Sequence, residues 1–126
     1  MVAVYTSRID YPGDDAMDVS AMTGNQVFAP LWPMVRDFKR RRMTWDEYKE
    51  DYVSLMWESY KVNRHEWDAI LQRERVVLLC FCYDVTQCHR LLLARIFEKL
   101  GARYLGEIDK WSRKQVGIPW EPGATF

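Results

Sequence analysis

The stretch VVLLCFC, residues 76–82, is apolar at every position. A strand with one face in water alternates apolar and polar residues, so an unbroken run predicts a strand covered on both faces, as in the middle of a parallel sheet. A helix is predicted over residues 88–100, because leucine, isoleucine and phenylalanine recur there at helical spacing, and Gly101 ends it as a C-terminal cap. A strand over 103–108 follows. The order strand, helix, strand predicts two parallel strands joined by a right-handed crossover.

Upstream of this unit, the sequence predicts two short strands and three helices. Thr44 and Glu47 have the spacing of a capping box, in which the threonine oxygen accepts a hydrogen bond from a free amide and the glutamate reaches back. The expected elements are strands over 2–6 and 17–21 and helices over 31–41, 44–60 and 64–73. We therefore predict an α/β fold: a small, mostly parallel sheet with flanking helices in a Rossmann-like three-layer arrangement.

Length and composition predict one domain over residues 1–126, with a core over 1–108 and an irregular tail over 109–126 that contains tryptophan, proline and glycine. Eighteen basic and eighteen acidic residues give zero net charge, which excludes a global positive field for nucleic acid but leaves room for a local patch. No apolar run approaches the roughly 20 residues that cross a bilayer. The start, MVAVYTSRID, lacks the pattern of a signal peptide, so we expect no membrane association.

The three cysteines, Cys80, Cys82 and Cys88, lie within nine positions of one another. An odd number cannot pair completely within one chain, and a disulfide framework usually joins distant segments. The pattern predicts reduced thiols in a cytoplasmic protein. The alternative is that the three are merely small buried side chains.

In open parallel sheets, ligands bind beyond the carboxyl ends of the strands. Two segments follow predicted strands in this way, Thr6-Ser7-Arg8 and residues 82–90. Asp84 or Thr86 is expected to cap the helix that begins in the second segment, which places the Cys-His-Arg triplet in its first turns. Free amides and partial positive charge at a helix N-terminus favour an anion.

Two residues of this triplet carry the predicted chemistry. The helix dipole and neighbouring cations favour the thiolate form of Cys88. The forked guanidinium of Arg90 suits a phosphate or a carboxylate. The segment therefore predicts a site that holds an anion and can attack an electrophile.

Three alternative roles compete for the cysteines. A zinc site is disfavoured because the spacing C-x-C-x5-C-H departs from the usual C-x2-C pairs, and because Cys80 would have to leave a buried strand. A phosphatase loop needs an arginine six positions after its cysteine, where this chain has Cys88 or Ala94. In the third, Cys88 and His89 simply cap and pack the helix. We expect neither a metal nor a cofactor.

The segments Leu78-Leu79-Cys80 and Cys88-His89-Arg90-Leu91-Leu92-Leu93-Ala94 together resemble the signature of the domain of unknown function 488 family. Members have a strand ending near a cysteine and a Cys-His-Arg triplet that opens a helix. Val4-Tyr5-Thr6-Ser7-Arg8 is similar to the family's first strand and loop, and Asp18-Val19-Ser20 to its aspartate segment. The resemblance covers roughly residues 2–108; Cys82 and the tryptophan-rich tail depart from it. It implies a compact α/β domain without an established general reaction.

The resemblance also implies roles for individual residues. Cys88 and His89 would be catalytic, as a thiolate and as a group that exchanges protons near neutral pH. Arg90 would bind an anionic group, with Arg8 as a second clamp. The other ligand-binding candidates are the hydroxyls of Thr6 and Ser7, Asp18 for a sugar hydroxyl or to orient His89, and Cys82.

Two functions remain open. The favoured one is a small enzyme, or enzyme-like fold, for a nucleotide or another phosphate-bearing molecule. The alternative is a non-catalytic module that binds nucleic acid or a protein partner, supported by the basic run at residues 39–42 and the aromatics Tyr83, Trp111 and Trp120. The alternative interpretation of the basic run is structural, because cations near a helix C-terminus are stabilised by the helix dipole.

Overall fold

The apolar run at residues 76–82 begins as a strand but leaves the sheet before its end. Strand β3 spans Arg75–Cys80, and its residues from Val76 onward are buried. Its neighbour β1, Ala3–Arg8, pairs with it as far as Arg8 opposite Cys80, so the ladder stops there. The prediction of a strand covered on both faces is confirmed as far as Cys80. Cys82 lies beyond the strand, contrary to the prediction that the strand includes it.

The structure is a computed structural model that describes residues 1–82, 84–109 and 114–116. Besides β1 and β3, its elements are the strands β2 (Ala16–Asp18), β4 (Arg103–Asp109) and β5 (Lys114–Val116), the helices α1 (Trp32–Lys39), α2 (Trp45–Val62), α3 (Arg64–Leu71) and α4 (His89–Lys99), and a short 3₁₀ helix, η1 (Val85–Gln87). Within these residues, no helix combines the length and the apolar character that crossing a bilayer requires.

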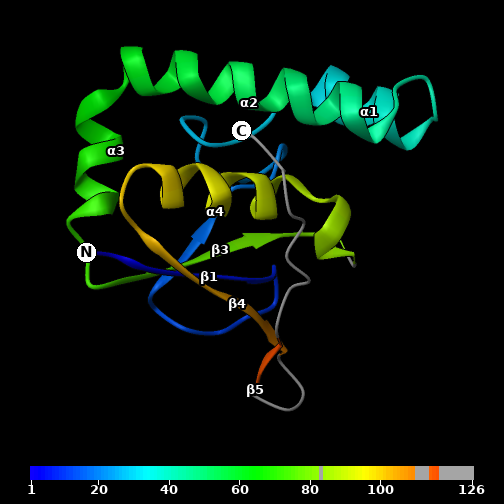
Figure 1. Cartoon of the computed structure of the whole chain (residues 1–126). Helices are drawn as coiled ribbons and strands as arrows, with labels where there is room; N and C mark the ends of the chain where they lie inside the picture. The colour runs from blue at the N-terminus through cyan, green and yellow to red at the C-terminus, as the bar shows by residue number, and fades with distance from the viewer. Residues whose placement is uncertain (83, 110–113, 117–126) are drawn as a thin grey trace.

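The strands form one sheet in the order β2-β3-β1-β4-β5, in which the first four are parallel and β5 is antiparallel to β4 (Figure 1). Strands β3 and β4, joined through α4, lie on either side of β1, so the predicted parallel strand-helix-strand unit is confirmed. Strand β5 lies in the tail that was predicted to be irregular. Residues 110–113 and 117–126 of that tail, with Trp111 and Trp120, are outside the described residues.

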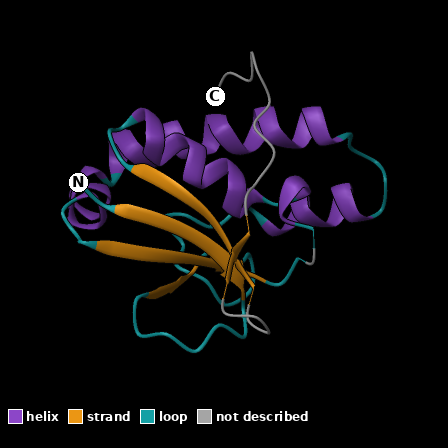
Figure 2. Cartoon of the chain, turned by 60° about the horizontal axis from the view of Figure 1, so that its bottom comes forward, coloured by secondary structure: helices purple, strands orange, loops and turns teal. Residues whose placement is uncertain are grey.

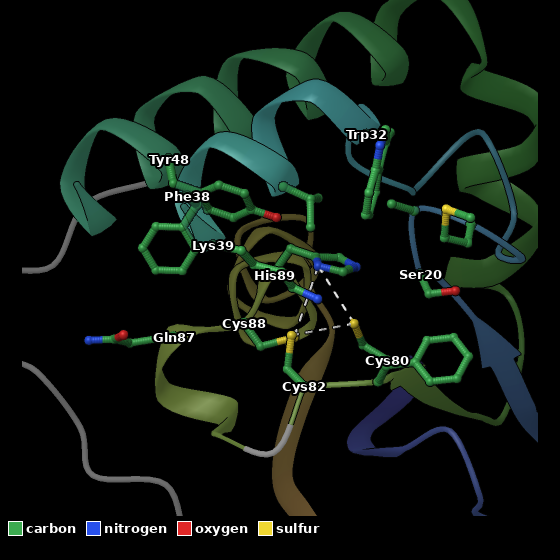
Figure 3. Close-up of a pocket in the computed structure, with 14 residues that line it drawn as sticks. Ser20, Trp32, Phe38, Lys39, Tyr48, Cys80, Cys82, Gln87, Cys88 and His89 are labelled. Carbon is green, nitrogen blue, oxygen red and sulfur yellow. Dashed lines mark hydrogen bonds between the residues drawn. The ribbon is translucent and has the colours of Figure 1, made fainter. Parts of the chain in front are cut away.

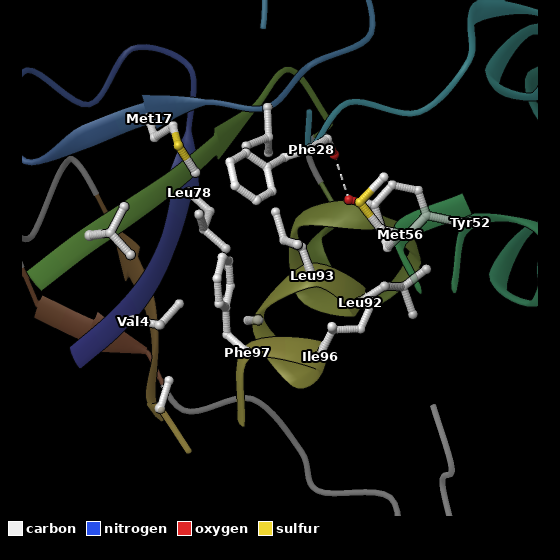
Figure 4. Close-up of a cluster of buried hydrophobic side chains, with 14 of the residues drawn as sticks. Val4, Met17, Phe28, Tyr52, Met56, Leu78, Leu92, Leu93, Ile96 and Phe97 are labelled. Atoms are coloured by element: carbon white, nitrogen blue, oxygen red, sulfur yellow. Dashed lines mark hydrogen bonds between the residues drawn. The ribbon is translucent and has the colours of Figure 1, made fainter. Parts of the chain in front are cut away.

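Helix α4 lies against the sheet, and α2 packs against α4, which gives the three layers of a small α/β fold (Figure 1). Figure 2 shows both helical layers on the same side of the strands. The core between sheet and helices combines Val4 and Leu78 from the strands with Leu93 and Phe97 from α4 (Figure 4). Burying a side chain of this kind stabilises a fold by about 1.5–3 kcal/mol, so this core fixes α4 on the sheet.

Two of the three predicted caps, those at the start of α2 and at the end of α4, are present. The amide of Glu47 donates to the Thr44 hydroxyl and the amide of Thr44 to the Glu47 carboxylate, each at 3.1 Å, so the box begins α2. After α4, Gly101 has a φ of +103°, a left-handed conformation that glycine adopts without strain. The amide of Ala102 donates back to the Phe97 carbonyl, which closes the helix end.

The start of α4 differs from the prediction. Its N-cap is Cys88, whose side chain makes no capping hydrogen bond, and the helix proper begins at His89. Asp84 instead accepts from the amide of Thr86 and caps η1. Asp84 therefore caps the short 3₁₀ helix and not α4. Cys88 takes the N-cap position of α4, at the end of the connection from β3.

Candidate functional site

A cavity of about 100 Å³ lies beyond the carboxyl end of β3. Its lining comes from the end of β3, the end of η1, the start of α4, the loop after β2, α1 along its whole length and the start of α2 (Figure 3). Cys80, Cys82, Cys88 and His89 form its floor, so the connection after β3 borders a hollow, as the rule for parallel sheets predicts.

The three sulfurs of the floor form a cluster. All three Sγ atoms lie within 4.8 Å of one another. Cys80 Sγ is 3.9 Å from Cys82 Sγ, and all three cysteines are free thiols. Cys80 and Cys88 are buried, whereas Cys82 is only partly covered. The last residue of a strand, a residue two positions later and a helix cap thus bring their side chains to one point.

His89 is held beside these sulfurs by the main chain. Its Nε2 lies 2.6 Å from the carbonyl oxygen of Val19, and because a carbonyl only accepts, Nε2 is the donor. The other ring nitrogen, Nδ1, faces the cluster at 3.9 Å from both Cys80 Sγ and Cys88 Sγ. The group that orients His89 is therefore a carbonyl next to Asp18 in the chain, and not the Asp18 carboxylate.

Arg90 lies beneath the floor with an exposed fraction of 0%. Its guanidinium donates two hydrogen bonds to the Glu107 carboxylate, from Nε to Oε1 at 3.2 Å and from Nη2 to Oε2 at 2.7 Å. Its Nη1 donates to the Cys82 carbonyl at 2.9 Å and lies 3.3 Å from Cys88 Sγ. The guanidinium ties the floor to β4, and it is not among the residues that line the cavity.

Burial and mutual hydrogen bonding separate the three thiols. Hydrogen bonds from the thiols of Cys80 and Cys88 hold the pKa of Cys82 well below its ordinary value, and the nearby Arg90 charge acts in the same direction. Burial raises the pKa of Cys88. Donation of its hydrogen to Cys82 raises the pKa of Cys80. These pKa directions favour the thiolate form at Cys82 over Cys80 and Cys88, whereas the sequence predicted the thiolate at Cys88.

The walls of the cavity are aromatic. Phe38 and Tyr48 lie with ring centroids 5.1 Å apart, and Trp32 borders the opening with 45% of its surface exposed. Lys39, at the last position of α1, adds a cation to the rim (Figure 3). Tyr48 is buried, and it also forms a wall of the cavity. Lys39 belongs to the basic run that the sequence singled out, whereas for Trp32 and Phe38 the sequence held no signal, because their role depends on how α1 lies over the sheet.

A second, more open hollow adjoins the first and shares Phe38 and Gln87 with it. Its volume is about 360 Å³. It is lined by Arg41 and Arg42 from the basic run, together with the start of α2, where Glu47 also borders it. A hollow that carries two arginines and one glutamate thus adjoins the aromatic, sulfur-floored cavity.

The other predicted ligand-binding residues lie elsewhere in the sheet and its loops. The hydroxyl of Thr6 is 2.6 Å from the Tyr104 hydroxyl, and the Ser7 hydroxyl donates to the Ile108 carbonyl at 2.9 Å. Asp18 accepts from the Ser20 amide at 2.8 Å, and Arg8 pairs with Cys80 in the strand ladder. None of these four is among the residues lining the cavity. Their predicted roles in ligand binding stay predictions, as do those of Cys82, Cys88, His89 and Arg90.

Comparison with known proteins gives one family. A family model described as the active DUF488-N3 subclade matches residues 23–101, more than half of the chain. The match includes α1 to α4 and the whole sulfur cluster, but not β1 or Asp18. No curated protein and no solved structure gives a significant match.

Proposed function

Since this chain belongs to the DUF488-N3 subclade of the domain of unknown function 488 family, the family that the Cys-His-Arg resemblance indicated, we propose that it binds a nucleotide or another small phosphate-bearing molecule and acts on it at the sulfur-floored cavity. The observation that carries the proposal is the pairing of two neighbouring hollows, one with aromatic walls and one bordered by Arg41 and Arg42. We further propose a cytoplasmic location, where the thiols stay reduced.

The two hollows suit the two halves of such a ligand. Trp32, Phe38 and Tyr48 offer ring faces against which a flat base stacks. Lys39 at the rim and Arg41 and Arg42 in the adjoining hollow offer charge to a phosphate. A ligand that spans both hollows makes apolar contacts with its ring and ionic contacts with its anionic group.

Cys82 is the reactive group in this proposal, since it is the one cysteine of the three that is only partly buried. Its thiolate would attack an electrophilic carbon of the bound molecule and form a C–S bond, while the bond from that carbon to the leaving group breaks and its electron pair departs with the leaving group, which takes a proton from water. Cys88 and His89 support it from the floor, where His89 Nδ1 lies beside two of the sulfurs. Arg90 acts through these groups: its contacts with Glu107 and Cys88 position the floor and stabilise negative charge there.

Calorimetric titration with a panel of ribonucleoside mono- and triphosphates tests binding. Trp32→Ala removes a stacking face and is expected to weaken binding by about tenfold, the effect of losing one base–aromatic contact. Lys39→Ala is expected to weaken the phosphate contribution by a similar factor. Arg40→Ala is the matched control, because Arg40 belongs to the same exposed run and is in neither set of lining residues. Equal effects of Lys39→Ala and Arg40→Ala would contradict the proposed orientation.

Turnover is tested with Cys82→Ser. We expect this variant to bind the ligand as the parent does and to lose turnover, because an alcohol is far less nucleophilic than a thiolate at neutral pH. Binding with no turnover by the parent would support the alternative, a non-catalytic module. Titration with a single-stranded oligonucleotide at low and high salt distinguishes the nucleic-acid version, whose affinity falls steeply with salt.

A further inference from the structure

The sulfur cluster has the dimensions of a metal site. Four ligands held at a Zn–S distance of about 2.3 Å lie about 3.8 Å from one another in a tetrahedron. Cys80 Sγ lies 3.9 Å from Cys82 Sγ and 3.9 Å from His89 Nδ1, and Cys88 Sγ lies 3.9 Å from the same nitrogen. All three sulfurs are within 4.8 Å of one another. His89 Nδ1 has this spacing to Cys80 and Cys88 but is not part of the group within 4.8 Å, so the ring has to move toward Cys82 Sγ for all four donors to reach one ion.

The surroundings of His89 match those of a metal ligand. A ligating histidine usually donates its second ring N–H to a carboxylate or a carbonyl, which fixes the ring and leaves the other nitrogen for the metal. The Nε2 of His89 donates to the Val19 carbonyl at 2.6 Å, and Nδ1 faces the sulfurs. This arrangement makes the ring a preorganised fourth donor.

The surroundings of Cys88 match those of a metal-bound thiolate. A buried guanidinium nitrogen, Arg90 Nη1, points at Cys88 Sγ from 3.3 Å. Three thiolates and one dication leave one negative charge, and an N–H donor to a sulfur stabilises it. The sequence disfavoured zinc because Cys80 would have to leave a buried strand, but Cys80 is the last residue of β3 and already faces the cluster.

We propose that Cys80, Cys82, Cys88 and His89 bind one Zn²⁺ ion through three thiolates and Nδ1. Sulfur and imidazole donors favour zinc over magnesium or calcium, which prefer oxygen. The proposal goes beyond the proposed ligand and does not depend on it. With zinc bound the sulfurs are ligands, so the attack proposed for Cys82 belongs to the metal-free form.

The test is the metal content of the full chain purified under reducing conditions without chelator and then dialysed against zinc. We expect one zinc ion per chain in the parent. Cys82→Ser, which changes a partly exposed residue beyond the strand, is expected to lower zinc affinity by roughly 100-fold or more, at least the loss seen when a supporting residue of a metal site is removed. Gln87→Ala is the matched control, since Gln87 borders the same cavity and offers no sulfur or imidazole.

Cobalt substitution reads the ligand set directly. Co²⁺ in the site is expected to give sulfur-to-metal charge-transfer absorption. This absorption should weaken in Cys82→Ser, which removes a thiolate. In His89→Ala it should persist, while the ligand-field bands change. Substoichiometric zinc in the reduced parent, or unchanged zinc content in Cys82→Ser, would overturn the proposal. The variants Trp32→Ala and Lys39→Ala leave the four zinc ligands unchanged. If nucleotide titrations show no loss of affinity in these variants, the result contradicts the proposed function and does not bear on the zinc site.

Discussion

Positive charge occurs around the cavity in two settings that differ in burial. Arg90 is fully buried beneath the floor, and its guanidinium donates hydrogen bonds to Glu107, Cys82 and Cys88. Residues 39–42, at the end of α1, are exposed at the rim. A buried, fully paired arginine holds a fold together, whereas an exposed cation can approach an anion from solution. The comparison shows that the Cys-His-Arg motif builds the floor of the cavity, and it is the reason why our proposal assigns the phosphate to the exposed run and not to Arg90.

The largest expected effect comes from removing the buried charge. Arg90→Met keeps the length and apolar stem of the side chain but leaves the Glu107 carboxylate, which is 13% exposed, without its partner. Breaking a buried ion pair in this way costs about 3–5 kcal/mol of unfolding free energy. Urea denaturation followed by circular dichroism measures the loss.

The control for Arg90→Met is Arg64→Met. Arg64 also pairs with a carboxylate, Asp68, but its side chain is 60% exposed. Surface pairs contribute about 0–1 kcal/mol, so this variant should stay close to the parent. The two variants could instead lose similar amounts of unfolding free energy, with phosphate binding lost only in Arg90→Met. That result would contradict a purely structural role for Arg90 and make it the ligand-binding residue that the family resemblance implied.

The double variant Arg90→Met, Glu107→Leu sharpens this result. Replacing both members of a buried pair removes the unpaired charge, and such replacements are often neutral or stabilising. We therefore expect the double variant to recover most of the free energy lost by Arg90→Met alone. If the double variant loses as much unfolding free energy as the two single variants together, the two residues act independently, which would conflict with their two hydrogen bonds.

The sequence predicted most of the fold because local signals and burial agreed. The unbroken apolar run became β3, the Thr44 capping box began α2, and Gly101 ended α4. The sequence also singled out residues of the sulfur cluster as site candidates, and three of them, Cys82, Cys88 and His89, lie together beside a cavity. It did not reveal the burial of Arg90, because Glu107 is 17 positions away and the pairing depends on β4 lying beside β1. The aromatic walls were equally hidden, since α1 reaches the cavity only through tertiary packing.

The next effect concerns the rim. Lys39→Ala combined with Arg42→Ala removes one cation from each hollow. We expect the affinity for a ribonucleoside triphosphate to fall by roughly 10- to 100-fold, while the free energy of unfolding changes by no more than about 0.5 kcal/mol, as for other surface substitutions. Calorimetric titration and urea denaturation of the same preparations give both values. Undiminished affinity in a folded double variant would remove the rim from the binding site.

Salt should separate the two settings without any substitution. The Debye length falls from about 10 Å at 0.1 M salt to about 3 Å at 1 M, so contacts of the exposed rim with a phosphate weaken several-fold, whereas a buried pair is screened much less. We expect nucleotide affinity to decrease over this range and the stability difference between the parent and Arg90→Met to stay nearly constant. A stability difference that shrinks in parallel with affinity would show that Arg90 is accessible to solvent.

The smallest expected effect concerns Arg41, whose φ of 59° is a left-handed value that glycine favours and arginine does not. The turn is fixed by hydrogen bonds from the amides of Arg41 and Arg42 to the carbonyls of Phe38 and Asp37, which close α1 and turn the chain toward α2. Arg41→Gly removes the steric cost but increases the freedom of the unfolded chain, so we expect a net gain of no more than about 1 kcal/mol.

Arg42→Gly is the matched control for Arg41→Gly, since Arg41 is the one non-glycine residue with positive φ among the described positions. Glycine at 42 relieves no strain, so thermal unfolding should give a lower midpoint for Arg42→Gly and a raised one for Arg41→Gly. If Arg41→Gly also weakens nucleotide binding, the strained turn places a cation in the basic hollow at a cost in stability. Equal destabilisation by both glycines would instead show that the Arg41 side chain stabilises the turn by more than its backbone strain.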